Sequence, residues 1–429
     1  MKVFKFGGAS IKDAKSIKNM SDIIVEYPDD RLVIVVSAMG KTTNHLEEIF
    51  FKKLKGGDFN PNLTELIQYH NKIVQELFDG NKAADTKPVK SLFDELSSIL
   101  DSNAKNKNGA QLYDSIVSYG ELLSSTIIGL YLKDRGINIK WMDARLLIKT
   151  DHTFREGKIN WKTTESLIRN TLEKKLSESK YITQGFIGST DEGHTTTLGR
   201  EGSDFTAAIF GASLDADSVT IWKDVPGILN ADPKRFEKTQ LYSNLSYQEA
   251  AEMTYYGASV IHPKTIKPLA NKNISLLVKS FEDPALDGTE INEDNPHDLP
   301  PTYVIKDNQC LVSFEVKDLT FIDEKNLSII FHILDKLNIK INMMQNSAVS
   351  LTICFDHRED KVSQLLHTLE NDFKIRYNQD LQLITIKNYT QDAVNIVSGN
   401  RDILVEQRTR NTYQIVVKLS WGNSTLRQL

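Results

Sequence analysis

The sequence predicts an α/β protein with a mainly parallel sheet sandwiched by helices, followed by a smaller α+β region. Three observations predict it. Short apolar runs of strand length alternate with amphipathic segments of helix length over the first two-thirds of the chain. Several of these runs end in polar loops that contain glycine. Beyond a proline-rich stretch the alternation continues on a smaller scale. Strands that alternate with helices favour a parallel sheet covered on both faces.

The elements of the first part follow from the spacing of apolar residues. Strands are predicted at 3–6, 32–36, 137–142, 181–187, 218–222 and 274–278. The run at 32–36, Leu-Val-Ile-Val-Val, is rich in the β-branched residues that favour strands. Helical spacing predicts helices at about 44–55, 64–77, 90–100, 111–135, 204–212, 247–256 and 263–271, and one at 11–26 after the first strand.

The second part begins after the stretch 283–302, where four prolines among acidic and polar residues are typical of a linker. Runs at 311–316, 324–337, 341–344, 349–355 and 360–369 predict a compact β-α-β-β-α unit. Weaker runs follow at 381–386, 393–397 and 413–419. We therefore expect a first domain at 1–282, a linker at 283–302 and a C-terminal region at 303–429. That region divides into a complete unit at 303–375 and a shortened one at 376–429.

Composition excludes several classes of protein. The chain has 429 residues, 40% of them hydrophobic, and a net charge of −5. Binding to nucleic acid as the main function would require a basic excess. The N-terminus lacks the apolar core of a signal peptide, and no stretch approaches the roughly 20 apolar residues that span a bilayer. Only two cysteines are present, without metal-ligand spacing. We expect a cytoplasmic protein without membrane or nucleic-acid partners.

The first informative site is Lys-Phe-Gly-Gly-Ala-Ser at 5–10, between a predicted strand and a helix. Gly7 and Gly8 let the backbone approach a ligand closely, and their N–H groups can form an anion site with the helix N-terminus. Lys5 can direct a cation at the same phosphates. Short glycine motifs have many false positives, so a tight turn with a solvated Lys5 remains an alternative.

A second loop, 37–44, contains Gly-Lys-Thr but is not a P-loop. The P-loop pattern needs a glycine five positions before Gly40, and that position holds Val35 inside a strand. The loop is instead a hydroxyl-rich segment at the C-terminal edge of the sheet, where open α/β sheets bind ligands.

The segment 195–206 carries the most information, because hydroxyls, two glycines, an arginine and an aspartate precede a helical run. Arg200 can hold a carboxylate through two parallel hydrogen bonds. Ser203 and Asp204 fall at the predicted helix start, where Asp commonly acts as a cap. Asp204 can equally orient Lys5 or help to place Mg²⁺, and the residues alone leave these roles open.

Two further loops complete the pattern. Residues 222–234 include Pro-Gly and Asp-Pro, which constrain a loop able to contact a base and ribose. Residues 256–264 include His262, for which packing is favoured over catalysis because transfer to a carboxylate needs no deprotonation.

Taken in order, the five segments over about 1–280 resemble aspartokinases of the amino-acid kinase superfamily, and the C-terminal region resembles their ACT-like, ferredoxin-like units. The resemblance implies an amino-acid-kinase-type sheet. It also implies phosphorylation of the aspartate side chain by ATP and Mg²⁺, giving 4-phospho-L-aspartate for lysine, threonine and methionine synthesis. No metal ligand of the protein itself is assigned, and without a dehydrogenase extension a monofunctional enzyme is expected.

Site residues are carried over position by position. Lys5 matches the catalytic lysine, with Asp204 as its organiser. The substrate-binding positions of the family are matched by Ser37, Thr43, Glu121, Arg200 and Ser203, among which Glu121 contacts the substrate amine and Arg200 a carboxylate. The nucleotide-binding positions are matched by Lys5, Gly7, Gly8, Lys223, Asp224 and Lys234.

The chain departs from the family at several positions. Ser259 stands where a lysine is common, Leu229 where an aromatic residue is common, and Glu201 where a glycine is common. Asn342 and Ala348 replace acids of lysine-inhibited relatives. Each charged contact so lost is worth on the order of 1.5–3 kcal/mol, so lysine is expected to bind less well here. An amino-acid effector at the ACT-like units and a homodimer or larger assembly through them are expected.

Two alternatives remain. One is a kinase of the same superfamily that acts on glutamate, acetylglutamate or a carbamate. The other is a catalytically inactive amino-acid sensor, which the presence of Lys5, Arg200 and Asp204 opposes.

Overall fold

The protein folds as two compact units. The computed structural model describes residues 1–28, 31–78, 85–102, 109–258, 261–296, 298–317, 320–399 and 401–418. The first unit consists of Met1–Ile228, Leu241–Ala251 and Ile261–Asn295. The second consists of Leu229–Gln240, Glu252–Val260 and Pro296–Leu429, so it takes two segments from within the first part of the sequence.

The first unit is built on an eight-stranded sheet with the order β3-β4-β2-β1-β7-β9-β10-β8. Its strands are β1 (Lys2–Phe6), β2 (Leu32–Val36), β3 (Ile139–Met142), β4 (Lys180–Gln184), β7 (Ser218–Lys223), β8 (Asn244–Ser246), β9 (Ser275–Ser280) and β10 (Thr289–Asn292). Neighbouring strands are parallel except for β9 and β10. All five residues of β2 are buried, as its β-branched sequence predicts for a strand covered on both faces.

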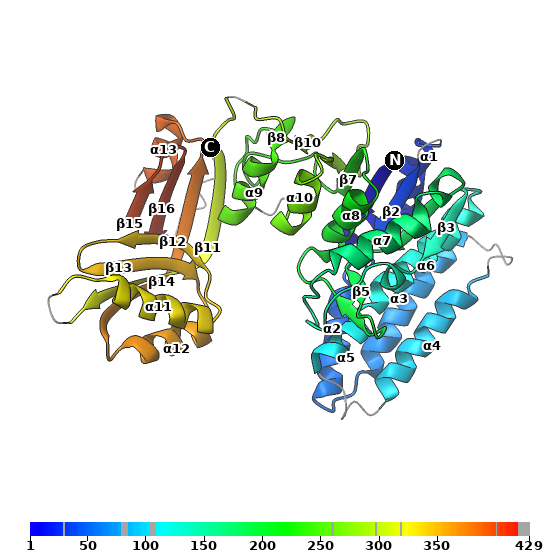
Figure 1. Cartoon of the computed structure of the whole chain (residues 1–429), viewed down its shortest axis with the longest axis horizontal. Coiled ribbons are helices and arrows are strands. Elements are labelled where there is room, and N and C mark those ends of the chain that lie inside the picture. Colours follow the sequence, from blue (N-terminus) through cyan, green and yellow to red (C-terminus); the bar gives the residue numbers. More distant parts are fainter. Residues whose placement is uncertain are drawn as a thin grey trace. The chain divides into compact units, whose positions relative to one another are not determined.

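Helices cover both faces of this sheet (Figure 1). The helices of this part of the chain are α1 (Ala14–Val25), α2 (Thr42–Leu54), α3 (Asn60–Phe78), α4 (Lys87–Asp101), α5 (Gly109–Val117), α6 (Tyr119–Asp134), α7 (Trp161–Leu172), α8 (Gly202–Ser213), α9 (Tyr247–Tyr256) and α10 (Pro263–Ala270). Some of them, such as α3 and α4, pack on other helices and not on the sheet, and α9 passes from the first unit into the second after Ala251. Gly129 of α6 packs on Ile182, while Gly211 of α8 packs on Val219. These two strand residues point to opposite faces according to the register through β1, so α6 and α8 lie on opposite faces. The predicted layered α/β fold is confirmed.

The helices α5 and α6 form an apolar stretch, Gly109–Asp134. By length and composition it could cross a membrane, but 83% of its most apolar window is buried inside the protein. Such burial is typical of a core helix.

The second unit is a six-stranded antiparallel sheet with the order β12-β13-β11-β14-β16-β15. Its strands are β11 (Thr302–Val316), β12 (Ile341–Asn346), β13 (Ser350–Asp356), β14 (Phe373–Lys387), β15 (Ile403–Arg408) and β16 (Thr412–Lys418), and its helices are α11 (Glu324–Lys336), α12 (Glu359–Leu369) and α13 (Gln391–Ser398). The long strands β11 and β14 pair along almost their whole length, with irregular register near Gln309. The two predicted α+β parts therefore share one sheet.

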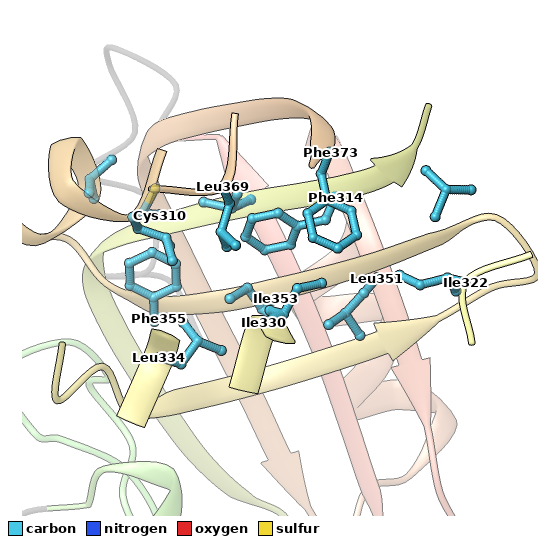
Figure 2. Packing of buried hydrophobic residues seen from close by; sticks show 14 residues of the cluster. Cys310, Phe314, Ile322, Ile330, Leu334, Leu351, Ile353, Phe355, Leu369 and Phe373 are labelled. Atoms are coloured by element: carbon cyan, nitrogen blue, oxygen red, sulfur yellow. The ribbon is translucent and has the colours of Figure 1, made fainter. Parts of the chain in front are cut away.

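Each part of the second sheet has its own apolar core. Under α11 and α12, Phe314 and Phe373 meet edge to face with ring centroids 6.0 Å apart, and Ile330 and Leu334 of α11 reach the same cluster (Figure 2). Under α13, a smaller cluster forms around Tyr413 and Ile415. The core under α13 is thus smaller than the core under α11 and α12.

Several elements differ from the sequence expectation. The stretch 283–302, expected to be a linker, contains β10, which pairs with β8 and β9 in the first sheet. The helix α7 and the short hairpin of β5 (Ile187–Ser189) and β6 (Thr195–Thr197) were not expected. The strands β5, β6 and β10 have three or four residues each, which is too short for an apolar period to be visible in the sequence.

Candidate active site

The parallel register creates the site. Phe6 at the end of β1 lies opposite Val36 of β2 and Trp222 of β7, so the loops after all three strands leave the same edge of the sheet. A cavity of about 950 Å³ lies there, within the first unit. Of the residues expected from the sequence, it is lined by Lys5, Gly8, Ser37, Thr43, Glu121, Arg200, Ser203, Asp204 and Lys223. Open α/β sheets bind ligands at this edge.

Lys5 and Asp204 form an ion pair at the cavity wall. The distance between Lys5 Nζ and Asp204 Oδ1 is 2.5 Å, and the two side chains are only 10% and 5% exposed. Asp204 lies in the first turn of α8, where a carboxylate is favoured by the helix dipole. The pair therefore holds a cation at a fixed place at the end of β1, next to the glycine loop.

The glycine loop is closely packed beneath the cavity. A Cβ added to Gly8 would lie 2.7 Å from the carbonyl oxygen of Ala38, so only glycine fits. A Cβ on Gly7 would lie 3.4 Å from Lys5 Nζ, although Gly7 itself does not line the cavity. The backbone is thus brought close to the lysine, as an anion site requires.

Glu121 is a buried carboxylate with one side unsatisfied. It is 3% exposed, and its Oε1 accepts a 3.1 Å hydrogen bond from the backbone N–H of Ala38. In the described part of the chain, its Oε2 has no hydrogen-bond partner. Burial raises the pKa of Glu121 to about 8, against the opposing effects of the Ala38 N–H and the Lys5 charge. A half-satisfied buried carboxylate in a cavity fits a cationic group of a ligand.

Arg200 lies on the exposed side of the cavity. Among the residues that the structure describes, its guanidinium has no hydrogen-bond or ion-pair partner. The flanking residues Gly199 and Glu201 both have left-handed backbones, with φ of 73° and 54°. This conformation costs a non-glycine residue roughly 1–2 kcal/mol, so Glu201 is strained at a position that a glycine would occupy without cost.

The hydroxyl residues complete the wall around Lys5. The carbonyl of Ser37 accepts a 2.6 Å hydrogen bond from Ser124 Oγ, which fixes the end of β2 to α6. Thr43 lies in the first turn of α2 and Ser203 in the first turn of α8. Both helices therefore direct their N-termini toward the cavity edge, an arrangement that favours anions.

Three expected nucleotide residues do not line this cavity. Gly7 and Asp224 are absent from its lining, and Lys234 belongs to the second compact unit. Ser259 lies outside the described residues. His262 caps the N-terminus of α10, where its Nδ1 accepts a 3.2 Å hydrogen bond from the backbone N–H of Lys264. That position agrees with the packed role favoured from the sequence.

Sequence reasoning missed part of the cavity wall. The lining residues outside the predicted segments are Glu47, Tyr113, Thr153, Phe154, Arg155, Glu156 and Phe186, whereas Ala38, Gly40, Thr197, Gly199, Glu201 and Gly202 belong to the loops 37–44 and 195–206 predicted from the sequence. The loop around Arg155 carries no glycine pair and follows no long apolar run, so no local signal identified it. Its one unusual feature, a left-handed backbone at Arg155 with φ of 70°, is visible only in the structure.

The fold and the cavity together define a class of protein: an α/β protein whose mainly parallel sheet carries, at one edge, a cavity lined by a glycine loop, a buried Lys–Asp pair and an exposed arginine. The family model of the amino acid kinase family matches residues 1–280. Lysine-sensitive aspartokinase 3 of Escherichia coli is 31% identical over 358 residues, covering 82% of this chain and 78% of the relative. Aspartokinase 1 of Arabidopsis thaliana is 31% identical over 389 residues, covering 87% of this chain and 67% of the relative. This chain also matches a bifunctional aspartokinase/homoserine dehydrogenase of that plant, of which it covers 42%.

Solved structures agree. Escherichia coli aspartokinase III, in complex with lysine and aspartate, matches 97% of this chain and 96% of its own at 27% identity and a TM-score of 0.81. The same enzyme in complex with aspartate and ADP matches at 26% identity and the same TM-score. The chain therefore belongs to the amino acid kinase family, and within it to the aspartokinases. The resemblance to aspartokinases that the sequence indicates is confirmed. The chain is accordingly an ATP-dependent kinase.

Proposed function

We propose that this chain transfers the γ-phosphoryl group of ATP to the side-chain carboxylate of L-aspartate, giving 4-phospho-L-aspartate and ADP. This is the first step toward lysine, threonine and methionine. The observation that carries the proposal is the meeting of the Lys5–Asp204 pair, Glu121 and Arg200 in one cavity. One end of the cavity is suited to phosphate and the other to an amino acid.

The reaction needs positioning and charge neutralisation rather than covalent catalysis. A carboxylate oxygen of aspartate attacks the γ-phosphorus while the bond to the β–γ bridging oxygen breaks, and no proton is transferred. Lys5, held by Asp204, neutralises charge on the transferring group. Arg200 binds the α-carboxylate and Glu121 the ammonium, which leaves the side-chain carboxylate directed toward the phosphate.

Contacts to the nucleotide are assigned to Gly7, Gly8, Lys223, Asp224 and Lys234. The part of the chain that the structure describes contains no group of three or more His, Cys, Asp and Glu able to hold a metal ion. Mg²⁺ needs no such group, because it is usually bound through substrate phosphates and one or two carboxylates, and Asp204 in the cavity lining would supply a carboxylate. Bound there, the ion would neutralise phosphate charge.

The deciding experiment is the hydroxamate assay with purified chain, ATP, Mg²⁺ and hydroxylamine. We expect product with L-aspartate and none with glutamate, acetylglutamate or carbamate. Product with another acid and none with aspartate would overturn the substrate assignment. Calorimetric binding of an amino acid without any formation of ADP would favour the inactive sensor.

Regulation and assembly are assigned to the second unit. We propose that its ACT-like sheet binds an amino-acid effector and mediates a homodimer or larger assembly in the cytoplasm. Asn342 supports an altered response to lysine, because its amide is already engaged by Lys306, Gln309 and Asp356. The hydroxamate assay repeated with lysine and with threonine tests the effector, and sedimentation equilibrium tests the assembly.

A further inference from the structure

One buried carboxylate of the first unit has no part in the mechanism above. Asp114 of α5 is fully buried and lies behind the cavity wall. Its Oδ2 accepts hydrogen bonds from the backbone N–H groups of Arg155 at 2.8 Å and Thr197 at 2.9 Å. Its Oδ1 accepts a third bond, from Thr197 Oγ1, at 2.8 Å. All three donors belong to residues that line the cavity.

These bonds hold a strained segment in place. Arg155 has a left-handed backbone with φ of 70°, which a residue with a side chain adopts at a cost. Its backbone N–H is bound by Asp114, and its guanidinium lies 4.0 Å from the ring centroid of the neighbouring Tyr113. Tyr113 is in turn hydrogen-bonded to Glu47 of α2. Two adjacent residues of α5 thus fix both the backbone and the side chain of Arg155.

The same segment supports Arg200. Thr197 ends β6 three residues before Arg200, and Asp114 holds both its backbone and its hydroxyl. A Cβ added to Gly199 would lie 3.3 Å from the carbonyl oxygen of Arg155 and 3.1 Å from Cγ of Glu156. The loop of Arg155 therefore packs directly against the residue before Arg200. The loop of Arg155, which packs against Gly199, and the end of β6 are therefore both hydrogen-bonded to Asp114.

We propose that Asp114 is a positioning residue that sets the guanidinium of Arg200 for the acceptor amino acid, by binding Thr197 and the loop of Arg155 together. The inference rests on the proposed function. Asp114 touches no substrate itself. It acts on the amino-acid side of the cavity, away from the Lys5–Asp204 pair and the glycine loop.

The three hydrogen bonds require a carboxylate at this place, despite the cost of its burial. Burial raises the pKa of Asp114 to about 6, although the bonds from Arg155 and Thr197 and the Arg155 charge lower it. The charged form is therefore less favoured in the folded protein than in water, and an amide at this place would avoid that desolvation. An asparagine at this position could not accept all three hydrogen bonds, because its NH₂ group would face one of the donors of Arg155 or Thr197.

The test is steady-state kinetics of Asp114→Asn in the full chain. We expect KM for aspartate to rise at least tenfold, while KM for ATP stays within about twofold. The matched control is Thr164→Val, which removes a buried hydroxyl that accepts a 3.0 Å bond from the Lys149 N–H outside the cavity. It should alter Tm without altering KM for aspartate.

A double-mutant cycle separates positioning from general loosening. Thr197→Val removes the hydroxyl that donates to Asp114. The rise in KM for aspartate in the double mutant, expressed as a free energy, should therefore be much smaller than the sum of the effects of Asp114→Asn and Thr197→Val alone. An unchanged KM for aspartate in Asp114→Asn, or equal increases in both KM values with a lowered Tm, would overturn the inference. A wild-type chain inactive with aspartate would instead overturn the proposed function.

Discussion

At the scale of single residues, the site depends on charges held out of water. The Lys5–Asp204 pair is almost fully buried, and removal of one partner of such a pair leaves an uncompensated charge. Glu121 is buried as well. Among the described residues, the cation that lowers its pKa is Lys5, which is already paired with Asp204. The buried Lys5–Asp204 pair and the buried carboxyl group of Glu121 are placed where a phosphate and an ammonium group of the substrates would interact with them.

Lys5→Met should lower kcat by about 10²–10³-fold, the range found when one preorganised electrostatic donor is removed. KM for aspartate should change by less than about threefold, because Arg200 and Glu121 remain. The measurement is ADP formation in a coupled assay. Since the variant leaves Asp204 unpaired, Lys5→Met/Asp204→Asn serves as the control for folding, with Tm recorded for both. A near-normal kcat in Lys5→Met would show that the lysine has another role.

Glu121 predicts a dependence of substrate binding on pH. With a pKa of about 8, its carboxyl group is largely protonated at neutral pH and becomes an anion as the pH rises. KM for aspartate should therefore fall between about pH 7 and 9, and Glu121→Gln should raise KM and remove this slope. A slope that persists in Glu121→Gln would assign the titration to another group.

The same shift predicts the effect of pH on stability. The folded state keeps a proton on Glu121 up to about pH 8, whereas an unfolded chain releases it near the ordinary value of 4.5. The free energy of unfolding should therefore decrease as the pH rises from 4.5 to 8. Glu121→Gln should weaken this dependence, as measured by urea denaturation at several pH values.

At the scale of elements, the loops after β1 and β2 approach each other closely beside the cavity. Gly8→Ala would place a methyl group 2.7 Å from a backbone oxygen, which cannot move aside as a flexible side chain could. We expect at least a tenfold rise in KM for ATP, because the glycine loop must shift. Gly57→Ala is the matched control, since its Cβ would meet nothing closer than 3.5 Å. Equal kinetics of the two variants would argue against a nucleotide role for this loop.

The elements that the sequence predicted correctly are those with long apolar periods. Strands such as β2 and the helices on both faces of the sheet have enough residues for a period to be visible, and the glycine loop and the Arg200 segment are local in sequence. The stretch around β10 was interpreted as a linker because its strand has only four residues between polar turns. The wall formed by Tyr113, Asp114 and Arg155 depends on contacts between distant segments, for which no single window carries a signal.

At the scale of the whole molecule, the division into units does not follow the order of the sequence. Residues 229–240, between β7 and β8, belong to the second unit. Their attachment is specific: the backbone N–H of Tyr303 donates to the Asn230 carbonyl at 2.7 Å, and Asn230 Nδ2 donates to the Pro301 carbonyl at 3.0 Å. The rings of Phe236 and Tyr303 lie 5.1 Å apart. A segment that begins six residues after the cavity-lining Lys223 is thus attached to the first strand of the second sheet.

This attachment can be weakened in the full chain. Arg235 makes an ion pair with Asp307, which also accepts a 2.8 Å bond from Gln382. The pair is partly exposed and is worth about 0.2–1 kcal/mol, so Arg235→Gln should increase local opening of 229–240 by up to about fivefold. The readout is limited tryptic cleavage at Lys234 and Lys238, and KM for aspartate should stay unchanged. Arg169→Gln, which removes an exposed pair with Asp215 in the first unit, is the matched control and should leave this cleavage rate unaltered. If the two variants were cleaved at 229–240 at the same rate as the wild type, the segment would be held by the hydrogen bonds of Asn230 and by the packing of Phe236 instead of by the ion pair, and the next substitution to test would be Phe236→Ala.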